Sequence, residues 1–180
     1  MSISNKVKAA LAGSTLLGAS ITMVIQHNEG LSLKAYKDSA GVPTICYGET
    51  KGVRMGDTAT MTQCKQQLIQ SAGEHAKALD GLPMSLTDVQ ILGALDMTYN
   101  IGISGFKDST TKRKLMQGDT KGAAQAVLSW RYITINGKKY DCSTKGNKVC
   151  YGLWERRKWE AKAIGNEFKT MQAAVAAMPK

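Results

Sequence analysis

A run of 17 residues without a charged side chain, Ala9 to Ile25, dominates the start of this 180-residue sequence. Lys6 and Lys8 precede the run, and this order of basic and uncharged residues is typical of segments that enter a membrane. Six of its positions are glycine, serine or threonine. As a helix it would span about 26 Å, at roughly 1.5 Å per residue, against about 30 Å for a bilayer core. We therefore expect only marginal insertion.

This segment has three candidate roles: a cleaved secretory signal, a permanent anchor, or a signal-anchor that later leaves the bilayer without being cleaved. Cleavage at a small residue such as Ala19 or Ser20 would remove much of the helix expected to lead into Glu29. We therefore favour release of the intact segment. The sequence is divided accordingly into an export segment, residues 1–28, and a catalytic domain, residues 29–180.

Two carboxylates in different surroundings follow the uncharged run, as acid-assisted cleavage of a glycosidic bond requires. Glu29 comes directly after the apolar segment, and burial there would favour its protonated form. Asp38 lies next to Lys37, and a neighbouring cation favours ionisation. Thr44 adds a hydroxyl group that can donate and accept, which suits a residue that holds a water molecule. We interpret Glu29 as the general acid and the other two as the groups that position the water.

The string around these residues, Glu-Gly-Leu-x-Leu-x-x-Tyr-x-Asp-x-x-Gly-x-x-Thr-Ile, resembles the phage-type lysozymes, glycoside hydrolase family 24. The resemblance implies that Glu29, Asp38 and Thr44 form the catalytic triad, because both intervals are reproduced. It also implies a lysozyme-like α+β fold and an endolysin that hydrolyses the β-1,4 bond between N-acetylmuramic acid and N-acetylglucosamine in peptidoglycan. Glu49 departs from the pattern, since family members often carry histidine there.

Two further segments, Asp96 to Gly102 and Gly152 to Arg157, resemble the family's cleft helix and its C-terminal element. By this likeness Asn100 is a substrate-binding amide, and Arg156 pairs with the catalytic glutamate. Arg157 is a close competitor for that pairing.

The uncharged run itself resembles the signal-arrest-release segments of certain phage endolysins, which also mix Ala, Gly and Ser with a few large aliphatic residues. The resemblance implies an exported enzyme that is tethered to the cytoplasmic membrane and then released to the periplasm.

The net charge of +10 predicts an anionic partner, and nucleic acid, anionic lipid and cell-wall polymer all satisfy that condition. Neither dense basic cluster, 112–114 nor 156–158, is interleaved with aromatics in a nucleic-acid-binding pattern. Charge alone does not choose among these partners; the family resemblance implies peptidoglycan glycan strands. We expect no nucleic acid, no metal, no cofactor and a monomer. The alternative function is a noncatalytic, membrane-tethered protein that binds peptidoglycan without cutting it.

Four cysteines fit an exported protein in an oxidising compartment, and their spacing lacks the paired pattern of a structural zinc site. Of the three connectivities we favour Cys46 to Cys64 and Cys142 to Cys150, since the first ties the predicted sheet to the next helix and the second closes a short loop. Residues 1–45 contain no cysteine, which excludes thiol exchange from the membrane segment.

Residue patterning predicts a mostly helical α+β domain with one small sheet between residues 33 and 48. A capping-box pattern at Thr60 to Gln63 predicts a helix that reaches about residue 79, and apolar spacing predicts a core helix over residues 86–99. Shorter helices are expected at 109–116 and 122–130, then an irregular stretch through Cys150 and a long helix from about Leu153.

Overall fold

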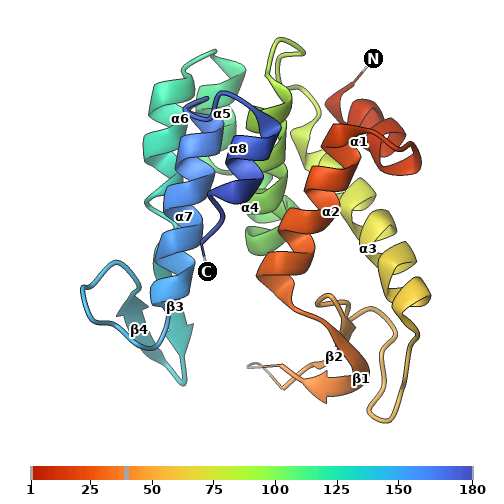
Figure 1. Cartoon of the computed structure of the whole chain (residues 1–180). Helices are drawn as coiled ribbons and strands as arrows, with labels where there is room; N and C mark the ends of the chain where they lie inside the picture. The colour runs from red at the N-terminus through yellow and green to blue at the C-terminus, as the bar shows by residue number, and fades with distance from the viewer. Residues whose placement is uncertain (1, 39–40, 180) are drawn as a thin grey trace.

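The computed structural model describes residues 2–38 and 41–179, and within them it contains eight α-helices, one 3-10 helix and two antiparallel hairpins (Figure 1). The mostly helical α+β architecture is confirmed. In chain order the elements are α1 (Ile3–Ala12), α2 (Leu16–Glu29), β1 (Ser32–Lys37), β2 (Pro43–Cys46), α3 (Met61–His75), η1 (Ala76–Leu79), α4 (Asp88–Lys107), α5 (Thr110–Met116), α6 (Thr120–Val127), β3 (Tyr132–Ile135), β4 (Lys138–Asp141), α7 (Tyr151–Ile164) and α8 (Met171–Ala176).

The uncharged N-terminal run is bent in this fold. Helices α1 and α2 meet at an angle of 88° across a short break. The Thr15 hydroxyl accepts a hydrogen bond from the Gly18 amide at 3.1 Å and donates to the Ala10 carbonyl at 3.2 Å, which caps α2 and ties it to α1. Among the described helices, none alone has the length and apolar character to cross a bilayer, whereas α1 and α2 together meet that test.

The two N-terminal helices contribute to the hydrophobic core. Their buried aliphatic side chains include Ile3, Val7, Leu17, Ile21, Val24 and Ile25. Helix α1 packs against α3 and η1, and α2 packs against α4 and α8. The division between residues 28 and 29 therefore falls in the last turn of α2 rather than in a linker.

The first hairpin lies where the sequence predicts a small sheet. Strand β1 pairs antiparallel with β2, with Tyr36 opposite Thr44 and Ser32 opposite Cys46. The disulfide between Cys46 and Cys64 ties this hairpin to α3. The sheet and the core helix α3 are thus held together covalently, as the favoured pairing requires.

The central helices begin at side-chain caps. Thr60 and Gln63 form the predicted capping box at the start of α3, and Thr87 forms an equivalent box before α4. The helix predicted to reach residue 79 is α-helical only to His75 and continues as the 3-10 turn η1. Helix α4 extends past the predicted residue 99 to Lys107, with a kink at Gly102, whose φ of +82° favours glycine.

The prediction of an irregular stretch through Cys150 is wrong for the first half of that stretch, because β3 and β4 form a second hairpin there. Asn136 and Gly137 have φ of +49° and +75°, the left-handed conformation that a two-residue hairpin turn demands. The predicted disulfide between Cys142 and Cys150 is confirmed and closes the loop that follows this hairpin. Helix α7 begins at Tyr151, two residues earlier than expected.

Candidate functional site

Glu29 is the last residue of α2, and the fold leaves its side chain only 22% exposed. Gly30 follows with φ of +69°, which lets the chain turn sharply from the helix into β1. Arg156 donates from Nη1 to Glu29 Oε1 at 2.9 Å. Burial raises the pKa of Glu29, and the charge and hydrogen bond of Arg156 oppose that rise. The side chain can therefore hold a proton at a higher pH than an ordinary glutamate.

Arg156 is itself fixed by a buried carboxylate. Its Nε and Nη2 donate to the two carboxylate oxygens of Asp96 at 3.0 and 2.9 Å, a bidentate contact. Asn28 also donates to Asp96, at 2.9 Å. This contact leaves Nη1 of Arg156 directed at Glu29. The sequence left two arginines in competition for the glutamate, and the structure pairs Arg156 with it.

Arg157 takes a different set of partners. It donates to the Trp130 carbonyl at 2.9 Å and, from Nη1, to Glu160 Oε1 at 2.6 Å. Its Nη2 donates to the side-chain oxygen of Asn100. Arg157 thus links Asn100, the predicted substrate-binding amide, to the buried interior.

Glu160 completes a buried ionic cluster that sequence reasoning missed. Its side chain is fully buried, and burial together with the neighbouring Asp96 raises its pKa against the opposing effect of Arg157. The cluster contains three carboxyl groups and two guanidinium groups, from Glu29, Asp96, Glu160, Arg156 and Arg157. One shared proton would balance its charge, so the protonation of Glu29 is coupled to buried groups behind it.

Asp38 and Thr44 lie on either side of the turn in the first hairpin. The Val42 amide donates to Asp38 Oδ1 at 2.9 Å, and the Thr44 hydroxyl donates to the Val42 carbonyl at 2.9 Å. Thr44, in β2, is buried, with 3% of its surface exposed. Asp38, which follows the last residue of β1, is partly buried. The backbone of Val42 thus contacts both side chains.

Glu29 and Arg156 each line a cavity. One, of about 360 Å³, is lined by Glu29, Gly30, Leu31, Ser32, Tyr36 and Cys46. The other, of about 350 Å³, is lined by His27, Asn28, Asn100, Gly152, Leu153, Arg156 and Pro179. Asp38 and Thr44 are absent from both sets, although Thr44 lies across the sheet from Tyr36. The structure therefore brings Glu29 and Arg156 into contact and places Asn100 beside them.

Glu49, which departs from the family pattern, contacts the backbone of the two residues that follow it. Its Oε1 accepts hydrogen bonds from the Thr50 and Lys51 amides at 2.9 and 2.8 Å. The carboxylate therefore stabilises the turn after β2.

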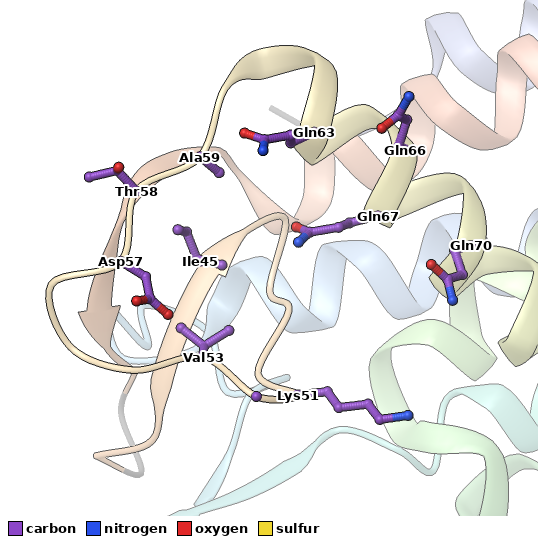
Figure 2. Close-up of a pocket in the computed structure, with 11 residues that line it drawn as sticks. Ile45, Lys51, Val53, Asp57, Thr58, Ala59, Gln63, Gln66, Gln67 and Gln70 are labelled. Atoms are coloured by element: carbon purple, nitrogen blue, oxygen red, sulfur yellow. The ribbon is translucent and has the colours of Figure 1, made fainter.

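A larger cavity, of about 430 Å³, lies between the first hairpin and α3 (Figure 2). Gln63, Gln67 and Gln70 of α3 line it together with Ile45 and Asp57. Ile45 follows Thr44 in β2, and successive strand residues point to opposite faces. Four glutamines line this cavity, and Asp57 is the one carboxylate in its lining, so it does not supply the pair of acids that glycoside cleavage needs.

No metal site is evident in the described ranges, 2–38 and 41–179, since no three His, Cys, Asp or Glu side chains are grouped to hold an ion.

A partly buried acid at the end of a helix, beside a small hairpin in a mostly helical domain, is the arrangement expected of a lysozyme-like glycosidase. Residues 26–160 match the phage lysozyme family, and the chain belongs to that family. It is 36% identical over 153 residues to the SAR-endolysin of Pseudomonas phage phiKMV, covering 84% of this chain and 89% of that protein. It is 33% identical over 167 residues to the SAR-endolysin of Enterobacteria phage P21, covering 88% and 93%.

The fold also matches solved structures. The endolysin from Escherichia coli O157:H7 phage FAHEc1 superimposes with a TM-score of 0.72 at 32% identity, covering 88% of this chain and 98% of that one. Together with the family match, this identifies the protein as a glycoside hydrolase of the lysozyme class, an endolysin that acts on peptidoglycan.

Proposed function

We propose that Glu29 is the general acid for hydrolysis of the β-1,4 bond between N-acetylmuramic acid and N-acetylglucosamine. The observation that carries this assignment is the burial of Glu29 against Arg156 at a cavity wall. A partly desolvated carboxyl keeps its proton until a leaving oxygen approaches, while Arg156 stabilises the anion that forms after transfer.

Asp38 and Thr44 position the attacking water in this mechanism. The Thr44 hydroxyl donates its own proton to the Val42 carbonyl, so its free lone pair is available to accept from a water. The Asp38 carboxylate, oriented by the Val42 amide, then accepts the second proton of that water. Asn100 binds the glycan through its amide NH₂ group, because Arg157 occupies its oxygen.

The assignment is tested by Glu29→Gln, which keeps the shape of the side chain and removes its transferable proton. We expect about 10²- to 10⁴-fold less release of reducing ends from purified peptidoglycan. Glu49→Gln is the matched control, because its amide oxygen can still accept from the Thr50 and Lys51 amides. Near-normal turnover by Glu29→Gln overturns the assignment, and binding of peptidoglycan without hydrolysis by the wild type would establish a noncatalytic wall-binding protein.

The roles of the other two residues are tested separately. Asp38→Asn should be severely impaired, whereas Thr44→Ser keeps a hydroxyl and part of the activity. The first product should have inverted anomeric configuration, since a water attacks directly. Capture of a covalent glycosyl group on Asp38 would contradict the water-positioning role.

We also propose that residues 1–28 first hold the enzyme at the outer face of the cytoplasmic membrane as a monomer, and release it to the periplasm. Support comes from α1 and α2, which are long and apolar enough to cross a bilayer only when taken together. In the fold they meet at an angle of 88°. A straight helix in lipid cannot place α1 against α3 and η1 while α2 packs on α4. The core that supports Glu29 is therefore incomplete until the segment leaves the bilayer.

Converting Gly13, Ser14, Gly18 and Ser20 together to leucine should lock the protein in the membrane, because added apolar surface strengthens insertion. Fractionation and lysis timing after depolarisation are the readouts. Release of this variant on the wild-type schedule contradicts the proposal, as does cleavage of the wild-type segment before activity is detected.

A further inference from the structure

The second hairpin and the loop after it carry unbalanced positive charge. We name residues 131–150 the cationic hairpin; its charged side chains are Arg131, Lys138, Lys139, Asp141, Lys145 and Lys148. Arg131 pairs with Asp141 at 3.3 Å, which neutralises both. The four lysines are exposed, and among the described residues none of them forms an ion pair. Four ammonium groups on one short element are therefore available to an anionic partner.

Aromatic rings accompany these charges on the hairpin. The Lys139 ammonium lies 4.4 Å from the centroid of the Tyr132 ring, and the Lys138 ammonium lies 5.2 Å from that of Tyr140. Tyr132 is 44% exposed, whereas Ile133 and Ile135 are partly buried. Tyr132 and Lys139 lie on one face of the hairpin, and Lys138 shares the other face with the two partly buried isoleucines. Cations are thus presented on both faces, and one of them is accompanied by an exposed tyrosine ring. This surface suits a hydrated anionic polymer better than insertion into lipid.

The cationic hairpin is ordered before any partner arrives. The Asn136–Gly137 turn fixes the strand register, and the disulfide between Cys142 and Cys150 closes the following loop. The Asn147 side chain donates to the Asp141 carbonyl at 2.9 Å, inside that loop. Binding therefore requires ordering of the lysine side chains and little ordering of the backbone.

The position of the cationic hairpin connects it to the catalytic site. The chain leaves it directly into α7, where Gly152, Leu153 and Arg156 line the cavity that contains Asn100. The two hairpins lie at the same end of the molecule, on either side of the lower ends of α2 and α7 (Figure 1). A glycan strand that reaches Glu29 therefore brings its attached groups near the cationic hairpin.

We propose that the cationic hairpin binds the carboxylates of the peptides attached to the glycan strand, an inference that rests on the proposed function. Peptidoglycan repeats such carboxylates along the polymer, so several lysines can be engaged by one strand. The contacts would hold the enzyme on peptide-bearing strands and leave the chemistry at Glu29 unchanged.

The test compares Lys138, Lys139, Lys145 and Lys148 all changed to Gln with a control that removes four other exposed lysines, Lys65, Lys121, Lys162 and Lys169. Both variants lose the same charge. On peptide-bearing glycan at about 0.01 M salt, we expect the hairpin variant to raise KM about fivefold or more, since each exposed charge contact contributes only modestly. The increase should fall below about twofold at high salt, where the screening length is roughly 3 Å at 1 M.

Peptide-free glycan of the same length shows whether the increase in KM depends on the attached peptides. Both variants should cleave it as the wild type does, with kcat unchanged. An equal KM increase on the two substrates, or an equal increase in the control variant, overturns the proposal. So does a selective loss of binding to vesicles of anionic phospholipid with unchanged KM on peptide-bearing glycan, which would make the partner a membrane.

A binding assay keeps the two proposals distinguishable. Both lysine variants are made in the Glu29→Gln background, and their binding to peptide-bearing and peptide-free glycan is measured by sedimentation. If the wild type cleaves neither substrate, the proposed catalysis fails while this binding difference still reports on the cationic hairpin.

Discussion

A methyl group added at Gly18 should disrupt the junction between the two N-terminal helices. An ideal Cβ at this position would lie 2.0 Å from the Ala10 carbonyl oxygen and 2.7 Å from its carbon. Both atoms belong to the backbone of α1, so no side chain can rotate away. Real Cβ contacts are essentially never shorter than 3.0 Å, and the end of α1 must therefore move away from α2.

The magnitude follows from two opposing effects. Overpacking costs about 1–3 kcal/mol, and backbone contact places Gly18→Ala toward the upper end of that range. Replacing glycine with alanine inside a helix returns about 1 kcal/mol. We expect a net loss of about 2 kcal/mol in the free energy of unfolding, which corresponds to a fall of roughly 4–8 °C in Tm for a chain of this size.

Gly73→Ala is the matched control, because Gly73 also lies within a helix and faces α1. Its added Cβ would meet the Lys8 side chain at 3.6 Å, an ordinary contact with a flexible group. This variant should gain up to about 1 kcal/mol from helix propensity. Thermal and urea unfolding of the soluble, oxidised proteins measure both changes. A Gly18→Ala protein as stable as the wild type would refute the close-packing argument.

Three further variants test the site and its supports. Arg156→Gln should move the alkaline limb of the kcat/KM profile to higher pH, because Arg156 opposes the burial that raises the pKa of Glu29; an unmoved limb in a pH–rate titration contradicts this. Replacing Cys46 and Cys64 with serine should cost about 3 kcal/mol in urea unfolding, from the entropy of an 18-residue loop; a loss below about 1 kcal/mol would count against it. In the wild type, folded Glu160 holds a proton that the unfolded chain releases above its ordinary pKa of 4.5, so the free energy of unfolding declines between pH 5 and pH 8. Glu160→Gln should make that decline shallower. Equal pH slopes of the unfolding free energy for the two proteins, measured with urea, would argue otherwise.

Local patterns in the sequence were sufficient for several elements. The Thr60 capping box could be predicted because it depends on residue types at a short, fixed spacing. The four cysteines allowed three connectivities, and the favoured one, which ties the sheet to the next helix and closes a short loop, is the one that the structure contains. The turn signal Asn136–Gly137 was also present, but the flanking strands are only four residues each and their alternation is weak. That hairpin was therefore missed.

The buried ionic cluster could not be read from local spacing. Asp96 and Arg156 are 60 residues apart, and their contact depends on how α4 packs against α7. Glu160 is one turn beyond Arg156, a spacing that on a solvated helix would indicate an ordinary surface pair. Only burial, which is a property of the whole fold, distinguishes this cluster from a surface network.

The backbone of Val42 contacts two side chains of the proposed site at once, Asp38 through its amide and Thr44 through its carbonyl. Its own side chain is exposed and makes no part of either contact. Substitutions at residue 42 that keep the amide hydrogen should therefore leave both contacts in place, and an alanine scan would pass over it. Proline is the exception, because it lacks the amide hydrogen that Asp38 accepts. Position 42 is thus constrained through its backbone, whereas positions 38 and 44 are constrained through their side chains.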